Sequence, residues 1–182
     1  MSDGAGQIYE RLLVLRCQGG DETALRELIE RYSPGLRLFL AKICDRRSSA
    51  DDLLQETWVD VYQKINRLEN PDAFVAWLYR IARDKAFREM RRRPMPSQES
   101  DEGCTEQLAE PEEDFTAEEA EQVRLALDEL PIDQREMLIL RFVESMSYQQ
   151  IAEVIGCPLG TVRSRLFYAK QALRAKLEPN LG

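Results

Sequence analysis

Apolar residues recur every three or four positions along most of this chain, which is the spacing of one face of an α-helix. No stretch alternates β-branched and polar residues in the way that is typical of strands. Glycines, prolines and capping residues divide the pattern into separate helices, about four of them before residue 94. The pattern therefore predicts an all-α protein.

Capping residues mark the boundaries of the first helices. The helix predicted over residues 7–18 ends at Gly19, and Asp21 is placed to cap the next one. Pro34 predicts a new helix start, because proline is tolerated in a first helical turn. Ser49 opens a helix whose apolar face is formed by Leu54, Trp58, Val61, Tyr62 and Ile65. The last helix of this segment carries an apolar stripe of Phe74, Trp77, Leu78 and Ile81.

The end of the chain has the pattern of four more helices. A T-x-x-E box that begins at Thr116 opens the first, which stops near Pro131. Asp133 is placed to cap the second, and a box that begins at Ser147 opens a third, which Gly156 ends. The last helix follows after a turn of about four residues, so the sequence predicts a helix-turn-helix.

Residues 158–177, which include the last helix, hold five cations and no acid. At 100° per residue its core-facing residues are Val162, Leu166, Ala169, Leu173 and Leu177. Ser164, Tyr168 and Gln171 point the opposite way, with arginines on both flanks. Such groups can contact base edges in a major groove, while further cations hold phosphates. The alternative is a solvated basic face on an ordinary helical domain.

The charge of the chain is unevenly distributed. Its 182 residues carry a formal charge of −8, but residues 1–93 sum to +2 and residues 122–182 to +1. Residues 94–121 hold 11 acids and no cation, and a stretch this poor in large apolar groups cannot repay the entropy of folding. The sequence therefore predicts two small helical domains, residues 1–93 and 116–182, joined by a flexible acidic linker over residues 94–115.

The composition argues against catalysis and cofactor binding. There is no histidine, the four cysteines form no CxxC pair, and there is no glycine-rich phosphate loop. We therefore expect no metal site, no cofactor, no small-molecule substrate and no enzymatic activity. No apolar run approaches the ~18 residues that span a bilayer, and the polar start MSDGAGQ has no signal-peptide pattern. We expect a cytoplasmic protein without membrane insertion.

Several motifs resemble one protein family. GTVRSRLFYAKQAL, preceded by SYQQIAEVIGCPL, resembles region 4 of bacterial sigma factors of the extracytoplasmic-function (ECF, group IV) branch of the sigma-70 family. SADDLLQETWVDVYQKI resembles the region 2.2 helix, and FVAWLYRIARDKAFREMRRR resembles regions 2.3 and 2.4. The resemblance covers about 150 residues, with the motifs in the family's order. It implies a region 2 helical bundle and a region 4 helix-turn-helix domain.

The resemblance also implies a function in transcription initiation. Sigma factors of this branch bind core RNA polymerase, direct it to promoters through the minus-ten and minus-thirty-five elements, and promote strand opening at the minus-ten element. Residues 1–93 would bind polymerase and the minus-ten element, and residues 116–182 the minus-thirty-five element. The implied partners are core polymerase, through its β′ clamp helices and β flap, promoter DNA and an anti-sigma factor.

Site residues are expected where this sequence matches the family's motifs. The polymerase-binding positions are Asp52, Gln55 and Glu56, which share one helical face. The minus-ten positions are Asn66, Arg80, Arg83, Asp84, Lys85, Arg88, Arg91 and Arg92. The helix over residues 74–93 has a net charge of +5, enough to follow a phosphate backbone. The minus-thirty-five positions are Thr161, Arg163, Ser164, Arg165, Phe167, Tyr168 and Lys170.

Three positions depart from the family's pattern. Asp84 stands where the family usually has asparagine, and Arg88 stands where it often has aspartate. Together they place opposite charges at i and i+4, which can preserve a pair on the helix face. Tyr168 stands where some relatives have arginine. The family's base preferences are therefore not carried over to this chain.

Two other functions compete with this interpretation. A sigma-like decoy that titrates an anti-sigma factor would not need basic DNA-facing surfaces, and this chain has two. A plain helix-turn-helix repressor would leave residues 1–93 without a function. The linker, about 22 residues long and able to reach ~70 Å, fits two roles equally well: an insert that mimics nucleic-acid phosphates in polymerase channels, or a solubilising tether.

Overall fold

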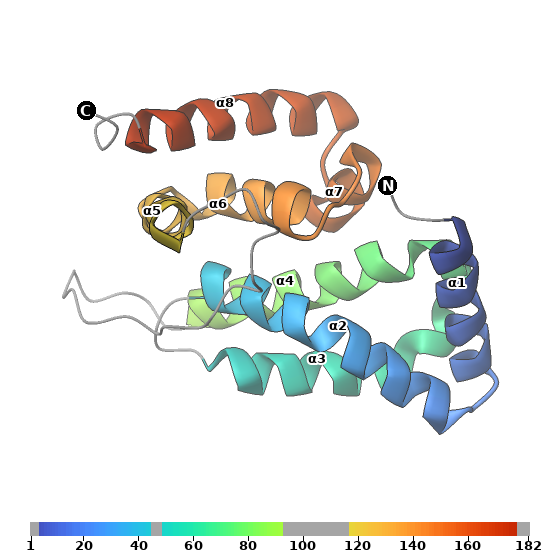
Figure 1. Cartoon of the computed structure of the whole chain (residues 1–182). Coiled ribbons are helices and arrows are strands. Elements are labelled where there is room, and N and C mark those ends of the chain that lie inside the picture. The colour runs from blue at the N-terminus through green and yellow to red at the C-terminus, as the bar shows by residue number, and fades with distance from the viewer. Residues whose placement is uncertain (1–3, 45–48, 93–116, 178–182) are drawn as a thin grey trace.

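The computed structural model describes residues 4–44, 49–92 and 117–177, and all regular structure in these ranges is helical (Figure 1). The first part holds α1 (Gly4–Gln18), α2 (Glu22–Ile43), α3 (Ala50–Lys64) and α4 (Phe74–Arg92), with the 3-10 turns η1 (Ile65–Arg67) and η2 (Pro71–Ala73) before α4. The second part holds α5 (Ala117–Asp128), α6 (Ile132–Leu138), the π-helical turn η3 (Ile139–Val143), α7 (Tyr148–Ile155) and α8 (Leu159–Leu177). The all-α prediction is confirmed. No helix of the described ranges has the length and apolar content that a bilayer crossing requires.

Several predicted caps are present. The Asp21 carboxylate accepts hydrogen bonds from the first backbone N–H groups of α2, and the Ser49 hydroxyl accepts one from the first turn of α3. Ser147 and Gln150 form a complete capping box at the start of α7. Gly156 ends α7 with φ of 75°, a left-handed conformation that costs glycine little.

Two predicted boundaries are wrong. α2 continues through Pro34 without a break, because its buried face is formed by residues on both sides of the proline and packing outweighs one lost hydrogen bond. α6 begins at Ile132 with Pro131 as its N-cap, so Asp133 lies in the first turn, where its charge complements the helix dipole. The predicted box at Thr116 lies outside the described residues.

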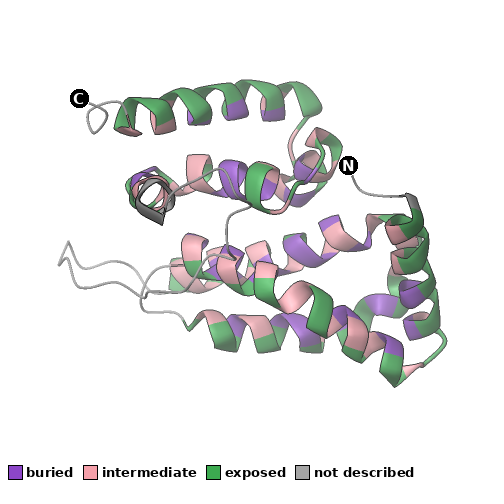
Figure 2. Cartoon of the chain, viewed as in Figure 1, coloured by how far each residue is buried: buried purple, intermediate pink, exposed green. Residues whose placement is uncertain are grey.

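Packing of the first part agrees only partly with the predicted apolar faces. In α3 the buried residues are Leu53, Thr57, Trp58 and Val61. Tyr62, predicted to face the core, is 63% exposed, and Leu54 is only half-buried. In α4 the buried side includes Phe74 and Leu78 as predicted, while Trp77 is half-buried. The buried face of α4 also includes Tyr79 and residues beyond it, because a second layer of helices covers this side (Figure 2).

The helices form stacked layers. α2, α3 and α4 form the lower layer with α1 across one end, α6 and α7 lie on top of α4 and α2, and α8 is outermost (Figure 1). One cluster of buried apolar side chains runs through both layers, from Phe39 and Ala82 below to Met137 and Val154 above. A smaller cluster of Leu130, Leu138 and Ala169 joins α6 to α8. The second layer covers one side of α4, and α8 lies on the surface.

Candidate nucleic-acid interface

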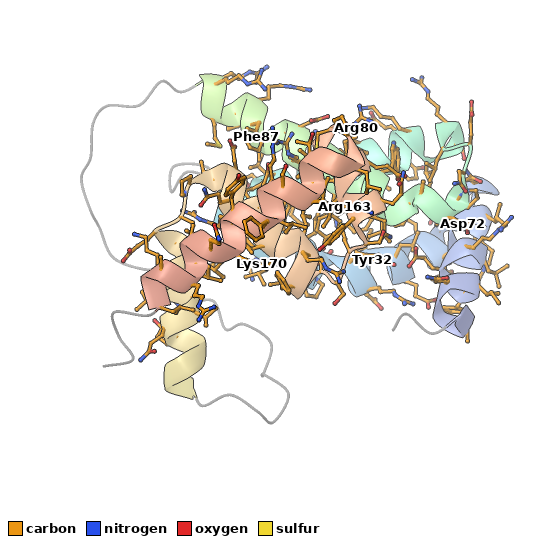
Figure 3. The ribbon with its side chains drawn as sticks, turned by 90° about the horizontal axis from the view of Figure 1, so that it is seen from above. Tyr32, Asp72, Arg80, Phe87, Arg163 and Lys170 are labelled. Carbon is orange, nitrogen blue, oxygen red and sulfur yellow. The ribbon has the colours of Figure 1, made fainter. Side chains whose placement is uncertain are left out.

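The last helix, α8, presents a continuous exposed face. Val162, Leu166 and Ala169 are buried beneath it, as the helical periodicity predicted. The predicted contact residues on the outer side are all exposed, namely Arg163, Ser164, Arg165, Phe167, Tyr168 and Lys170. Figure 3, viewed from above, shows α8 in front of the rest of the molecule, with Arg163 and Lys170 along it. This face can be approached by a large partner.

Local contacts order this face. Phe167 and Tyr168 pack edge to face with ring centroids 5.6 Å apart, although they are 53% and 61% exposed. The Ser164 hydroxyl donates to the Thr161 carbonyl at 3.1 Å, and Thr161 is half-buried in the first turn. Two aromatic rings held on the surface between cations suit contact with bases and sugars better than with bulk water.

The C-terminal end of α4 forms a second cationic surface. Asp84, Arg88, Arg91 and Arg92 line an open surface pocket of about 340 Å³. All four are exposed, and the three guanidinium groups outnumber the single carboxylate. The structure thus brings together four of the eight predicted minus-ten residues. Asn66 and Arg80 are also exposed, but they do not line this pocket.

Arg83 points away from this pocket and into the second layer. Its Nε and terminal nitrogen donate to the two carboxylate oxygens of Glu136 on α6 at 2.8 and 3.0 Å. Its guanidinium also lies 4.4 Å from the centre of the Phe87 ring. Burial raises the pKa of the Glu136 carboxyl, and the Arg83 charge offsets part of that rise.

The Lys85 side chain is also directed toward acidic residues and not toward solvent. Its side chain is 13% exposed, and its Nζ lies 3.1 Å from Asp60 Oδ2 and 3.6 Å from Glu56 Oε2 on α3. Burial opposes ionisation of Asp60, but hydrogen bonds from Lys64 and Lys85 lower the pKa of its carboxyl on balance. Lys85 lies on α4, but in this structure its side chain packs against the acidic face of α3.

That surface is a groove of about 620 Å³ between α3 and α4. It is lined by Asp52, Gln55, Glu56, Val59, Asp60, Gln63 and Lys85. The three predicted polymerase-binding residues are exposed and lie together in it. Sequence reasoning missed Asp60 and Gln63, although their spacing from Glu56 by four and seven places them on the same helical face. An acidic groove with an exposed valine suits a partner that is basic and partly apolar.

Nothing in the described residues suggests a metal or redox centre. These ranges hold no cluster of histidine, cysteine or acidic side chains able to bind a metal ion. Among the described cysteines, Cys17 is buried and Cys157 half-buried, and neither of these two forms a disulfide. Burial raises the pKa of the Cys17 thiol to about 11, so it is protonated and unreactive at neutral pH.

Comparison with known proteins identifies similar sequences along nearly the whole chain. The family described as sigma-70 region 2 matches residues 28–94, and the family described as sigma-70, region 4 matches residues 120–173. The chain is 32% identical to the ECF RNA polymerase sigma-E factors of Salmonella typhimurium and Escherichia coli, over 95% of this chain and 96% of theirs. The same identity relates it to the sigma-E factor of Haemophilus influenzae, over 96% of this chain and 98% of that one.

Two solved structures have a similar arrangement of helices. The first is CnrH in complex with the cytosolic domain of CnrY, with a TM-score of 0.69 and 24% identity over 93% of this chain and 97% of that one. The second is the sigma factor RpoE in complex with the anti-sigma factor NepR from Bartonella quintana. Its TM-score is 0.65, with 29% identity over 84% of this chain and 96% of that one. The predicted family resemblance is confirmed.

Proposed function

The chain belongs to the ECF family of RNA polymerase sigma factors, and we propose that it acts through three separate surfaces: α8 on the minus-thirty-five element, the end of α4 on the minus-ten element, and the α3 groove on core polymerase. The family makes the chain an alternative sigma factor for transcription initiation, a regulator with no catalysis of its own. The observation that carries the finer proposal is the presence of two cationic surfaces and one acidic groove on a single chain.

The α8 surface suits duplex DNA. An arginine can bridge guanine O6 and N7, and an aromatic edge can meet a thymine methyl group. Arg163, Phe167 and Tyr168 offer these groups on the exposed side of a helix that follows the αL turn at Gly156. The capping box stabilises the start of α7, the helix that precedes α8. In a helix-turn-helix this first helix supports the second one in the major groove.

The end of α4 suits a single strand. Arg88, Arg91 and Arg92 can follow a phosphate backbone, and Asp84 can accept hydrogen bonds from the donor groups of an unstacked base. Extruding a base costs a few kcal/mol, so contacts in this pocket must offset that cost for strand opening to depend on sequence. Promotion of strand opening is therefore assigned to the surface of Asp84 and the three arginines.

The α3 groove suits the β′ clamp helices of polymerase. Its carboxylates would pair with basic side chains, and Val59 would pack against apolar ones. The domain of residues 116–182 would contact the β flap, with residues 94–115 as the acidic linker between the two domains. The similar sigma factor from Bartonella quintana binds an anti-sigma factor, which supports a partner of that kind for this chain. A transcription factor of this family would act in the cytoplasm.

Reconstitution with core RNA polymerase tests the proposal. The chain and core enzyme would be incubated with genomic promoter fragments, and start sites would be mapped from the transcripts. We expect initiation at a restricted set of promoters that share two elements. Binding to an anti-sigma factor without any specific initiation would favour the decoy function instead.

The polymerase surface has a separate test. Gln55→Ala with Glu56→Ala should weaken core binding at least about tenfold, whereas Glu30→Ala, a glutamate on α2 outside the groove, should not. Equal core affinity of the three proteins would show that polymerase binds elsewhere.

A further inference from the structure

The loop between α3 and α4 holds an expected DNA contact that does not line the arginine pocket. Residues 65–73 comprise the 3-10 turns η1 and η2 and the segment that joins them. Asn66 lies in this loop, and Arg67 and Glu69 are exposed beside it. An amide, a guanidinium and a carboxylate together offer hydrogen-bond donors and acceptors to the edge of a base. The way in which the loop is held therefore decides where these groups point.

Helix α1 lies along this loop and contacts both of its turns. Arg11 and Gln18 are seven positions apart, so they share one face of α1. Arg11 pairs with Asp72 in η2 at 3.3 Å, and Figure 3 shows Asp72 beside α1. Both of these side chains are 56% exposed, so this ion pair adds little to the stability of the loop. The stronger contact lies at the other end of the face, where Gln18 meets η1.

The side-chain amide of Gln18 joins α1 to two carbonyl groups of the loop. Its Nε2 donates to the Ile65 carbonyl at 2.9 Å and to the Leu68 carbonyl at 2.8 Å. An amide nitrogen carries two protons, so both donors are used, and two carbonyl partners fix which way the amide faces. The Ile65 carbonyl also accepts a hydrogen bond from the Leu68 N–H at 3.1 Å, which closes η1. One side chain thus bridges the two ends of the turn that contains Asn66 and Arg67.

Gln18 is itself held in place by the end of α1, of which it is the last residue. The Asp21 N–H donates to the Arg16 carbonyl at 3.1 Å. The Gly20 N–H donates to the Cys17 carbonyl at 2.9 Å, and Gly20 has a φ of 86°. These two bonds and the left-handed glycine form a Schellman motif. The Asp21 carboxylate also accepts from the Arg16 guanidinium and caps α2. The amide of Gln18 therefore reaches the loop from an ordered helix end.

Apolar packing holds the turn against the core but leaves its orientation to the hydrogen bonds. Ile65 is 4% exposed, and Leu68 packs against the buried cluster. Such packing is non-directional, whereas hydrogen bonds are directional, so the two bonds from Gln18 orient both carbonyls. Because a peptide unit is planar, the Ile65 carbonyl sets the direction of the Asn66 N–H, and the Leu68 carbonyl sets that of the Glu69 N–H. Gln18 thus orients the backbone at both exposed polar positions.

We propose that Gln18 is a positioning residue for minus-ten recognition: through the Ile65 and Leu68 carbonyls it orients the loop residues that read one base of the single strand. The proposal rests on the minus-ten function proposed above, and it adds a contact held from α1 to the pocket of Asp84 and the α4 arginines. Gln18 itself does not touch DNA. Its loss should change the base preference at one position and leave the phosphate contacts of α4 as they are.

Selection from a randomised single strand tests this role in the complex with core polymerase. The full chain and core enzyme would bind a short single-stranded DNA of randomised sequence, and sequencing of the bound strands gives the base preference at each position. Asn66→Ala identifies the position that the loop reads, as the one whose preference it abolishes. Gln18→Met keeps most of the side-chain volume but removes both donors. It should lower the preference at that same position at least about fivefold.

Three further variants separate orientation of the loop from general damage. Gln7→Met makes the same change at an exposed glutamine of α1 and should keep the wild-type preference. Gln18→Glu keeps the shape of the side chain but replaces the donor with an acceptor, so it should lose the preference as Gln18→Met does. Arg91→Ala removes a phosphate contact and should weaken the binding of all sequences alike.

The loop also gives a readout that needs neither polymerase nor DNA. In the free chain, NMR measures hydrogen exchange at the Leu68 amide, whose bond to the Ile65 carbonyl closes η1. Gln18→Met should speed this exchange about tenfold, because the turn loses two hydrogen bonds that hold it to α1. The Gly156 amide, which bonds to the Ala152 carbonyl in the second part of the chain, should keep its rate.

The outcomes separate this proposal from the proposed function. A preference that Asn66→Ala abolishes but Gln18→Met or Gln18→Glu keeps would overturn the positioning role. A wild-type preference that Asn66→Ala leaves intact at every position, or a parallel loss at all positions in Gln18→Met, would overturn it as well. If the wild type showed no base preference at all, the minus-ten function would fail. Exchange at Leu68 would then decide: a faster rate in Gln18→Met supports the hold of Gln18 on the loop, and an unchanged rate rejects it.

Discussion

Arg83 Nε on α4 lies 2.8 Å from Glu136 Oε2 on α6, and Glu136 is only 1% exposed. The two residues are 53 positions apart in the chain. A buried ion pair adds little net stability over apolar residues of similar volume, but removing one partner leaves an uncompensated buried charge. This pair therefore joins α4 to the second layer in a way that tolerates loss of neither partner alone.

Removing one partner of this pair should destabilise the protein. Arg83→Met keeps much of the apolar stem but leaves a carboxylate buried without its counter-charge, so we expect the free energy of unfolding to fall by about 3 kcal/mol at pH 7. Adding Glu136→Met should recover most of the loss. Urea denaturation measures both, with Arg80→Met, an exposed arginine of α4, as control. Equal midpoints for Arg83→Met and Arg80→Met would contradict the expected role of the pair.

Mild acid should stabilise the fold around Glu144. Burial raises the pKa of the Glu144 carboxyl above its ordinary value of 4.5, although the hydrogen bond from Tyr79 acts in the other direction. A carboxyl whose pKa is higher in the folded than in the unfolded chain binds its proton more tightly when the chain is folded. The resulting stabilisation is full below the ordinary pKa and is lost as the pH rises through the raised one.

Urea denaturation from about pH 7 toward about pH 5 tests this expectation. The free energy of unfolding should increase as the pH falls, and Glu144→Gln should reduce this dependence because its side chain does not titrate. If Glu144→Gln showed the same pH dependence as the wild type, the dependence would come from other carboxyl groups.

The two sides of α8 should respond differently to truncation. Leu166 is 1% exposed, so Leu166→Ala should lower the free energy of unfolding by about 2–4 kcal/mol. Phe167 is 53% exposed, so Phe167→Ala should change the free energy of unfolding by less than about 0.5 kcal/mol while weakening duplex binding. Denaturation and fluorescence anisotropy on the same preparations separate the two effects. Stable protein with undiminished duplex binding in Phe167→Ala would remove this residue from the interface.

The capping box of α7 should matter to DNA binding without touching DNA. Ser147→Ala removes the hydroxyl that accepts from the Gln150 N–H, at a cost of about 1 kcal/mol. We expect this loss of stability in urea denaturation. Duplex binding should also weaken, because the helix that packs beneath α8 is less stable. Ser147→Thr keeps the acceptor and should behave like the wild type. Failure of threonine to rescue would mean that the serine acts in another way.

Two basic residues of α4 should differ in the salt dependence of single-strand binding. Arg91→Ala removes a cation that lines the pocket and should reduce the slope of log affinity against log salt by about 0.7. Lys85 is directed to Asp60 and Glu56, so Lys85→Ala should leave this slope unchanged. It should instead alter core-polymerase binding, measured by gel filtration of the complex. Equal slope changes in the two variants would show that Lys85 contacts DNA as Arg91 does.

The sequence by itself determined most of the local structure. Helical periodicity placed Val162 and Leu166 beneath α8, and the caps at Asp21, Ser147 and Gly156 lie where side-chain chemistry predicted them. Such features depend on residues within about one helical turn of each other, so their cause is visible in a short stretch of sequence. The exposed face of Asp52, Gln55 and Glu56 follows from the same periodicity.

Only the tertiary structure decided which charged groups are available. Nothing near Arg83 in the sequence indicates Glu136 as its partner, and Gly35 gives no sign that its missing Cβ admits Glu144. Pro34 lies within an unbroken helix because packing on both sides of it outweighs the local preference. Contacts between distant segments depend on how whole helices stack, and local periodicity does not contain that information.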